Sequence, residues 1–176
     1  MDDADLIKDF RKGRTEAFSE LVQKYSKPLT MTIFRMIRDV EESKDISQTV
    51  FLKAYEGLPG FTMASSFKTW LYKIALNTVR DYLRKRKPIH STDALETLVD
   101  PAEPTWDSLD KKRNLSRMRE AMETLPPKQR LTLQLRVYED MDYEEIARVL
   151  GGTAGGARVN FFQAAKALRE KLGAMQ

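Results

Sequence analysis

Apolar residues recur at helical spacing along most of this 176-residue chain, and one stretch interrupts the pattern. Side chains three or four positions apart share a helix face, so the pattern favours amphipathic helices. Residues 88–105 break it with three prolines and a Ser-Thr-Asp cluster. The sequence predicts an all-α fold of two small helical domains, residues 1–88 and 113–176, joined by a linker at 89–112. The alternative is a surface loop within one domain.

Charge changes sign at the same boundary. Residues 80–87 hold five Lys or Arg residues and one acid, whereas residues 88–110 hold six acids and no Lys or Arg. The net charge of +4 is modest, so this segregation is more informative than the total. It indicates a phosphate-seeking surface followed by a flexible acidic linker.

Composition limits the classes of protein that the chain can be. Hydrophobic residues make up 41% and charged residues 32%, with no apolar run that reaches the roughly 18 residues of a membrane span. There is no cysteine, the single histidine is His90 in the expected linker, and no Gly-rich phosphate loop occurs. We therefore predict no metal site, no cofactor, no catalytic residue and no membrane insertion. The acidic N-terminus is unlike a signal peptide, which indicates a cytoplasmic protein.

Cap and turn residues divide the N-terminal half into helices. Thr15 is placed to cap the second helix, and Pro28 fits the first turn of a new one. A further helix starts at about Glu41 and ends near Gly57, and Ser66 is placed to cap the last helix of this half.

That last helix is predicted to carry opposite apolar and polar faces. Its aromatic residues Trp70, Tyr72 and Tyr82 are interpreted as core or half-buried positions rather than stacking platforms. Steps of three and four residues place one amide and four cations on the other face: Lys73, Asn77, Arg80, Arg84 and Lys87. Such a face suits phosphate contacts and the reading of a base edge.

The C-terminal half contains one ambiguous segment. Residues 131–138 alternate apolar and polar residues as a strand does, yet Leu131, Leu135 and Tyr138 also match a helix. We predict a helix, because no partner strand is available. Pro126 and Pro127 separate it from the preceding helix.

The last two predicted helices form a helix-turn-helix pattern. Asp142 is placed to cap the first, Gly151 permits the turn, and Thr153 is placed to cap a final helix that runs to about Leu172. The second helix would offer four side chains to a major groove: Arg158, Asn160, Gln163 and Lys166. The alternative is a helical hairpin that only packs.

These motifs resemble the extracytoplasmic-function sigma factors, which are two-domain bacterial sigma factors. Residues 45–55, Asp-Ile-Ser-Gln-Thr-Val-Phe-Leu-Lys-Ala-Tyr, are similar to the helix of that family that binds core RNA polymerase. Residues 67–77 are similar to its promoter-melting helix. Further matches to its upstream-element domain follow in order: Leu125 to Arg130, Glu145 to Ala147, Leu150, Gly151, Thr153, Gly155, Leu168 and Arg169.

The resemblance implies a polymerase-docking face on the first motif. It would include Asp45, Gln48, Thr49 and Phe51, whose carboxylate and amide would satisfy donors on the partner. As bare residues, Asp45 and Gln48 more often belong to an ordinary solvated helix surface.

The resemblance also implies contacts with the promoter −10 element. A loop would hold a base flipped out of the duplex, through Phe61, Thr62, Ser65 and Ser66; these residues also suit a plain turn. The following helix would read a base and neutralise phosphates through Lys73, Asn77, Arg80, Arg84 and Lys85.

Recognition of the promoter −35 element would fall to Thr153, Arg158, Asn160, Gln163 and Lys166. Family members often carry basic residues at the positions of Asn160, Gln163 and Ala165, so this helix is lightly charged. Since each missing phosphate contact lowers the salt slope of binding by about 0.9, we expect weaker upstream binding or a shift toward amide readout.

The resemblance finally implies partners and a path for the linker. The partners are core RNA polymerase, promoter DNA and an anti-sigma factor that the sequence does not identify. The acidic linker would thread through the polymerase cleft; as alternatives it is a solvated tether, or its acids fold back on the basic face around residues 80–87. A freestanding helix-turn-helix regulator is the other function class that we retain.

Overall fold

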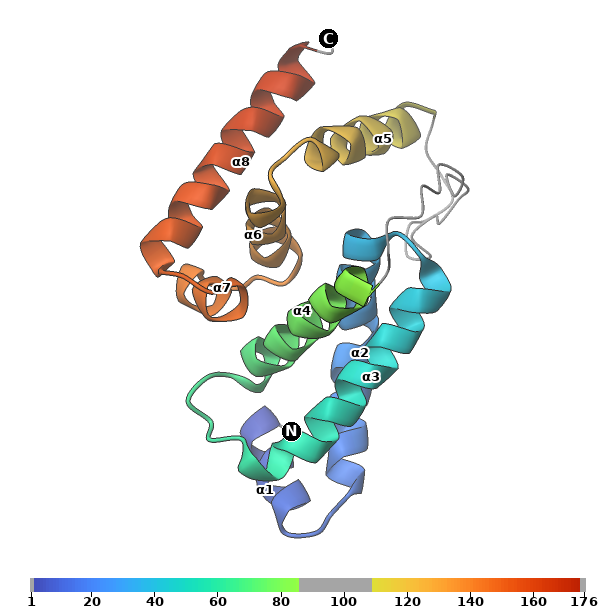
Figure 1. The fold of residues 1–176 in the computed structure, drawn as a ribbon, viewed down its shortest axis with the longest axis vertical. Helices are drawn as coiled ribbons and strands as arrows, with labels where there is room; N and C mark the ends of the chain where they lie inside the picture. The colour runs from blue at the N-terminus through green and yellow to red at the C-terminus, as the bar shows by residue number, and fades with distance from the viewer. Residues whose placement is uncertain (1, 86–108, 175–176) are drawn as a thin grey trace.

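The computed structural model describes residues 2–85 and 109–174, and every regular element in them is helical. The chain order, shown in Figure 1, is α1 (Asp3–Arg11), α2 (Glu16–Ile37), α3 (Val40–Gly57), the 3-10 turn η1 (Leu58–Gly60), α4 (Phe67–Lys85), α5 (Leu109–Glu123), α6 (Pro127–Tyr138), α7 (Tyr143–Leu150) and α8 (Ala154–Ala174). The all-α prediction is confirmed, as is the helix at residues 131–138. Within the described ranges, no helix is both long and apolar enough to cross a membrane.

Helices α1 to α4 form the N-terminal bundle, in which α2, α3 and α4 pack closely (Figure 1). The apolar stripes of these helices face inward, and their large aliphatic side chains with no exposed surface are Leu21, Leu29, Ile33, Val50, Leu71 and Val79. Burial of each such side chain contributes about 1.5–3 kcal/mol. Packing along these stripes therefore holds the helices that carry the exposed polar faces.

Pro28 does not start a helix, which corrects our expectation. It lies inside α2, which is continuous from Glu16 to Ile37. An interior proline costs about 3 kcal/mol because it lacks the amide donor of a helical hydrogen bond. Leu21, Leu29 and Ile33 lie on both sides of this position and are fully buried, so their packing outweighs the local cost.

Four of the helices begin at side-chain caps. Asp39 accepts from the Glu42 amide at 3.0 Å, and Ser66 accepts from the Thr69 amide at 3.1 Å. Asp142 forms a capping box with Glu145, and the Thr153 hydroxyl accepts from the Gly156 amide at 3.1 Å. The predicted caps at Ser66, Asp142 and Thr153 are confirmed. Thr15 lies at the N-cap of α2, but its side chain makes no capping hydrogen bond.

Helices α5 to α8 form the C-terminal unit. A small core between α5, α6 and α8 contains Met122, Leu133 and Leu168. The turn between α7 and α8 passes through Gly151 and Gly152, whose φ angles of 76° and 133° are unfavourable for other residues. The predicted helix-turn-helix therefore forms as two packed helices with a glycine turn.

The segment expected to be a linker is described only at its end. Helix α5 begins at Leu109, so the last four residues of the expected linker, 109–112, are helical, and residues 89–108 lie outside the described residues.

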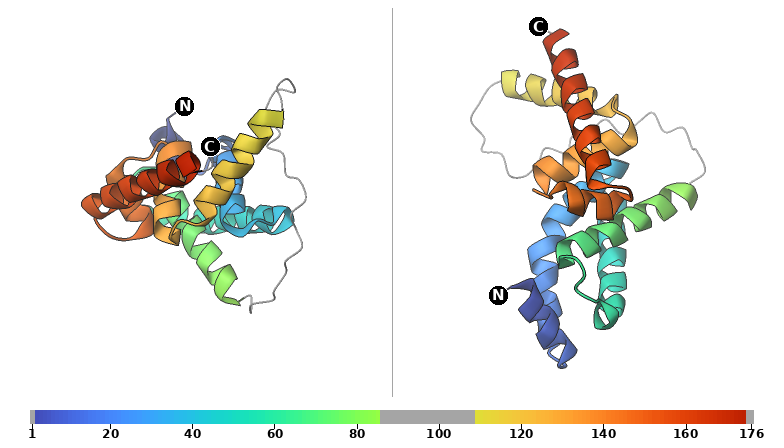
Figure 2. Two further views of the ribbon diagram at one scale, coloured as in Figure 1. Left: turned by 90° about the horizontal axis from the view of Figure 1, so that it is seen from above. Right: turned by 90° about the vertical axis from the view of Figure 1, so that its left-hand side faces the viewer.

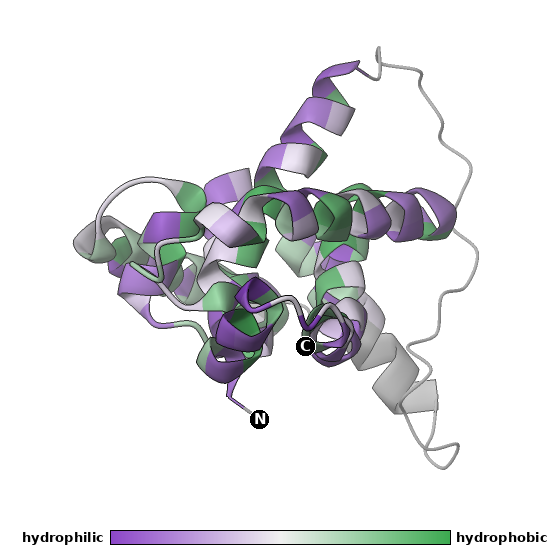
Figure 3. Ribbon diagram, turned by 90° about the horizontal axis from the view of Figure 1, so that it is seen from below, coloured by the Kyte–Doolittle hydropathy of each residue, from purple (hydrophilic) through white to green (hydrophobic). Residues whose placement is uncertain are grey.

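The N-terminal bundle and the C-terminal unit pack against each other through α4 and α7 (Figure 2). One cluster of buried apolar side chains runs through both, and it includes Leu71 and Val79 of α4 together with Ile146 and Val149 of α7. Coloured by hydropathy, the helices show apolar and polar residues alternating around their axes (Figure 3). The contact between the two halves thus continues the core.

Candidate nucleic-acid interface

Helix α3 presents a polar face beside an apolar groove. Asp45, Gln48 and Thr49 are exposed, and the Thr49 hydroxyl donates to the Asp45 carbonyl at 2.9 Å. Phe51 is buried, with 8% of its surface exposed. The groove next to it has a volume of about 360 Å³ and is lined by Phe18, Val22, Gln48, Phe51, Leu52 and Tyr55.

Two exposed apolar residues of this groove were not predicted as site residues. Leu52 is 66% exposed and Tyr55 43% exposed. The Tyr55 ring packs edge-on against Phe10 and Phe18 at 5.1 Å, so it is fixed although partly open to solvent. Because Phe51 is buried, the exposed apolar surface of α3 comes mainly from Leu52 and Tyr55. Leu52 and Tyr55 both belong to the motif at residues 45–55. Only the packing of the helices shows that these two of its apolar residues remain exposed to solvent.

The loop before α4 is anchored at one end and open in the middle. Phe61 is buried and stacks on Trp70 with ring centres 4.7 Å apart, and its carbonyl accepts from the Arg11 guanidinium. Thr62 is exposed, Ser65 is half-buried, and Ser66 is exposed at the start of α4. The structure thus brings the three hydroxyl residues to the surface and places the Phe61 ring in the core beneath them.

The polar face of α4 is exposed as its spacing predicts. Lys73, Asn77, Arg80, Arg84 and Lys85 all lie in solvent. Arg84 contacts Asp81 at 3.0 Å, but both side chains are at least half exposed, so the pair holds that guanidinium only weakly. Lys87 lies outside the described residues. The interpretation of the aromatic residues is confirmed: Tyr72 is buried, and Trp70 and Tyr82 are half-buried.

The exposed face of α8 differs from the set of residues that we predicted. Arg158 lies with its guanidinium carbon 5.3 Å from the centre of the Tyr143 ring, and Lys166 reaches Glu170 at 4.0 Å. Val159 and Phe162 are 53% and 61% exposed on the same face. Phe162 stands four residues from both Arg158 and Lys166, and Val159 stands three residues before Phe162. Their apolar character kept them out of the predicted set.

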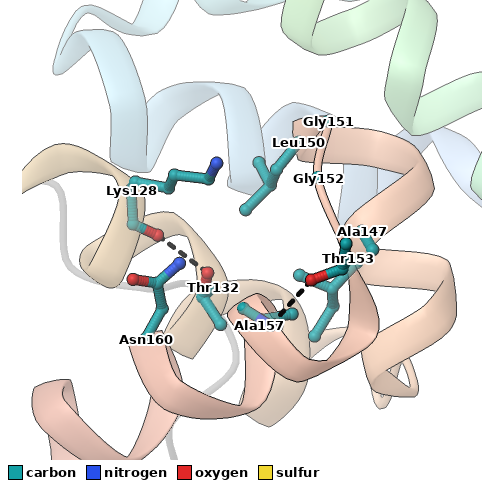
Figure 4. Close-up of a pocket in the computed structure, with 11 residues that line it drawn as sticks. Lys128, Thr132, Ala147, Leu150, Gly151, Gly152, Thr153, Ala157 and Asn160 are labelled. Carbon is teal, nitrogen blue, oxygen red and sulfur yellow. Dashed lines mark hydrogen bonds between the residues drawn. The ribbon is translucent and has the colours of Figure 1, made fainter.

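Two α8 residues that we predicted to read bases contact other residues of the chain. Asn160 is half-buried and lines a cavity of about 40 Å³ with Lys128, Thr132 and Thr153 (Figure 4). Gln163 is exposed, but its side-chain oxygen accepts from the Gln129 amide at 2.9 Å. Asn160 therefore lies toward α6, and Gln163 would need to exchange a partner before it reads a base.

Comparison with known proteins places both halves of the chain in one class. Residues 21–89 match the family model for Sigma-70 region 2, and residues 115–168 match that for Sigma-70, region 4. These are the two regions of a sigma-70-type transcription initiation factor.

Relatives match over nearly the full length. The RNA polymerase sigma-H factor of Pseudomonas aeruginosa is 33% identical over 97% of this chain and 93% of its own. The ECF RNA polymerase sigma-E factor of Escherichia coli is 30% identical over 95% of this chain and 92% of its own. The chain belongs to the extracytoplasmic-function group of RNA polymerase sigma factors, and its function is that of a sigma factor in promoter-specific transcription initiation.

Solved structures share the fold. CnrH in complex with the cytosolic domain of CnrY aligns over 99% of both chains, with a TM-score of 0.75 and 22% identity. The sigma factor RpoE of Bartonella quintana in complex with the anti-sigma factor NepR aligns over 90% of this chain and 98% of its own, with a TM-score of 0.72 and 23% identity. The arrangement of two helical units is therefore shared with these proteins.

Proposed function

We propose that α3 is the face through which this sigma factor binds core RNA polymerase. The observation that carries the proposal is the groove beside Leu52 and Tyr55, next to the exposed Asp45 and Gln48. An exposed leucine at the edge of an apolar groove is the kind of anchor that a partner helix buries, and the polar groups beside it fix orientation.

The test is co-elution of the purified chain with bacterial core polymerase on size exclusion. An Asp45→Ala, Gln48→Ala variant and a Leu52→Ala variant should weaken the complex. Glu56→Ala, an exposed acid on the same helix, is the matched control and should co-elute as the wild type does. Failure of the wild type to co-elute, with DNA binding retained, would contradict this proposal and remove the roles of Asp45, Gln48, Thr49 and Phe51.

We also propose a division of promoter contacts between the two units. The domain of residues 1–88 would melt the −10 element through the hydroxyl residues of the loop before α4 and the polar face of that helix. The exposed cations of α4 support this role, because phosphate contacts supply much of nucleic-acid affinity. The domain of residues 113–176 would hold the −35 element through α8, and the linker at 89–112 would connect the two.

The loop itself supports the melting role through its anchored ends. Arg11 and Trp70 fix Phe61, and the cap at Ser66 fixes the start of α4, so the hydroxyls of Thr62 and Ser65 stand on a short span between fixed points. A flipped base costs a few kcal/mol of stacking, and a preorganised polar pocket offsets part of that cost. In this proposal, the buried Phe61 ring anchors the N-terminal end of the loop and does not itself contact the base.

We propose that the chain acts in the cytoplasm without a cofactor and without catalysis of its own. An anti-sigma factor is a further proposed partner, because the RpoE structure is a complex with the anti-sigma factor NepR. Affinity capture with the tagged chain from its own cells, followed by competition with core polymerase, tests this. A captured protein that remains bound while core polymerase binds the same chain would contradict the inhibitor role.

A further inference from the structure

Several arginines surround one carboxylate where the C-terminal end of α2 meets α5 and α6. Arg38, which follows α2, pairs with Glu123 of α5 at 3.2 Å. Arg130 of α6 donates to the Glu123 carbonyl at 3.3 Å, so its guanidinium lies beside the same residue. Arg35 lies one turn before Arg38 on α2, and Arg119 lies one turn before Glu123 on α5. We call these residues the arginine cluster: Arg35, Arg38, Arg119 and Arg130.

The arginine cluster carries more positive charge than its neighbours neutralise. Within residues 2–85 and 109–174, Glu123 pairs only with Arg38, and neither Arg35 nor Arg119 has an ion pair. The Arg35 guanidinium lies instead 3.8 Å from the centre of the Tyr138 ring. Burial lowers the pKa of the Arg38 guanidinium; Glu123 offsets part of this effect, and the other arginines of the cluster lower it further. The guanidinium groups therefore repel one another.

Two further acids near the arginine cluster are held by other partners. Asp39 accepts from the Glu42 amide at 3.0 Å and caps α3. Glu139 is buried, and its carboxylate accepts from the Thr32 hydroxyl at 2.8 Å and from the Tyr72 hydroxyl at 2.5 Å. Burial and the bond to Glu139 raise the pKa of Tyr72 well above its ordinary value, so its hydroxyl remains a donor. Both carboxylates are thus directed away from the unpaired arginines.

The backbone of Arg38 adopts a conformation that a side chain makes unfavourable. Its φ of 60° and ψ of 29° are left-handed, and glycine or asparagine commonly takes this position after a helix. The helix end needs only the backbone, since the Arg38 amide donates to the Phe34 carbonyl at 2.8 Å. A charged residue that persists in such a conformation indicates a use for its side chain.

The arrangement suits a compact ligand with phosphate groups. Arg35, Arg38 and Arg130 are half-buried, which reduces the screening of their charge, and Arg119 is exposed and accessible. The planar guanidinium fork matches the oxygens of a phosphate in paired hydrogen bonds. Because the cluster gathers around one residue, Glu123, it suits a small anion better than an extended strand. None of its members lies on α4 or α8.

We infer that the arginine cluster is a binding site for a small anion that carries two or more phosphate groups. Inorganic pyrophosphate and the phosphates of a nucleotide have this chemistry. An anion with several negative charges matches the unpaired arginines, while Glu123 continues to hold Arg38. The bound anion would contact α2 of the N-terminal bundle and α5 and α6 of the C-terminal unit. The inference does not rest on the proposed roles of α3, α4 or α8.

Isothermal titration calorimetry of the full chain with inorganic pyrophosphate, at low ionic strength, tests the site. Arg119→Ala should bind about tenfold more weakly than the wild type, because it removes a charge-assisted hydrogen bond. Arg119→Lys keeps the charge but lacks the fork, so its affinity should fall between the two. Lys12→Ala removes an exposed cation near the N-terminal end of α2 and should bind as the wild type does.

Arg38→Gly separates loss of the site from loss of folding. Glycine adopts the left-handed backbone readily, so this variant should unfold at the wild-type temperature or above it. Its affinity for pyrophosphate should nevertheless fall about tenfold. Circular dichroism measures the unfolding, and the exposed Arg119 provides the same test at a position without an ion pair.

Titrations with ATP and with a single-stranded oligonucleotide of random sequence identify the source of the phosphates. ATP affinity equal to that of pyrophosphate would assign recognition to the phosphates alone. Tighter ATP binding that Arg119→Ala weakens would assign the site to a nucleotide. Binding of the oligonucleotide without binding of pyrophosphate or ATP would overturn the small-anion site.

Two further results would also overturn the site. The first is no binding of pyrophosphate to the wild type. The second is an equal loss in Lys12→Ala and Arg119→Ala, which would show attraction to the charge of the whole chain. Neither result affects the proposed function, since the pyrophosphate titration contains no DNA and no polymerase.

Discussion

Helices α4 and α8 are both proposed to contact promoter DNA, yet they present different surfaces. The exposed face of α4 carries Lys73, Arg80, Arg84 and Lys85 around one amide. That of α8 carries Arg158 and Lys166 with two apolar residues between them, Val159 and Phe162. The first surface has the charge to neutralise phosphates in the proposed role, whereas the second has fewer charged side chains and more apolar ones.

The difference matches the tasks that the two helices would perform. A melted strand offers phosphates and unstacked bases, and cations beside aromatic or polar pockets hold it with strong salt dependence. A duplex element is read at its base edges, where amide and apolar side chains contribute discrimination and phosphate contacts fix register. We therefore expect α4 to supply more of the electrostatic affinity.

The largest effect should come from removing two cations of α4. Arg80→Ala together with Arg84→Ala should reduce the salt slope of single-strand binding by about 1.4, since each phosphate contact contributes about 0.7 on single strands. Fluorescence anisotropy across a salt series measures the slope. Lys12→Ala with Lys27→Ala, two exposed cations elsewhere on the N-terminal bundle, removes equal charge and should leave the slope nearly unchanged.

A smaller effect should distinguish the two cations of α8. Arg158 lies near the start of the helix, where recognition helices contact DNA, while Lys166 lies two turns further on beside Glu170. Arg158→Ala should weaken binding of the holoenzyme to the upstream element by about 1–3 kcal/mol, and Lys166→Ala by less. Equal losses in a binding titration would contradict this orientation.

Adding charge to α8 should make it more like α4. Gln163 is exposed and bonded only to Gln129 among the contacts described, so Gln163→Arg places a cation on the surface without disturbing the core. The salt slope of duplex binding should steepen by about 0.9 if the new side chain reaches a phosphate. Ala165→Arg, at another position where the family is often basic, gives an independent comparison. No change with either substitution would place this face away from the DNA.

The smallest expected effect is on the folding stability of the protein at alkaline pH, and it comes from Tyr72 of α4. The folded pKa of Tyr72 is raised above its ordinary value of 10.0, so its contribution to stability is present below pH 10 and is lost as the pH rises further. In denaturant titrations, Tyr72→Phe should lose less stability between pH 9 and pH 11 than the wild type does, because it has no hydroxyl to ionise. Tyr55→Phe, at an exposed tyrosine, should behave as the wild type does.

The local sequence pattern predicted the helices and the exposed polar face of α4. It could do so because helical periodicity and capping depend only on residues that are close in sequence. Lys73, Asn77 and Arg80 are exposed as their spacing requires. Pro28 was misread because the packing of α2, which the local sequence does not contain, outweighs a missing hydrogen bond.

The site residues that sequence placed less well depend on tertiary contacts. Phe61 and Phe51 turn into the core, and Asn160 lies toward Lys128, because their neighbours come from other helices. Glu139 was not predicted as a buried residue for the same reason. A single acid after a helix gives no signal of burial in the sequence, because its partners, Thr32 and Tyr72, lie on α2 and α4.

The division of promoter contacts is tested most directly on two fragments of a promoter that the holoenzyme transcribes, one complete and one lacking the upstream element. On the complete fragment, both the Arg158→Ala variant and the Arg80→Ala, Arg84→Ala variant should bind more weakly than the wild type. On the truncated fragment, the Arg158→Ala defect should disappear while the α4 defect persists. An Arg158→Ala defect that persists without the upstream element, or an α4 defect that disappears with it, would contradict the account.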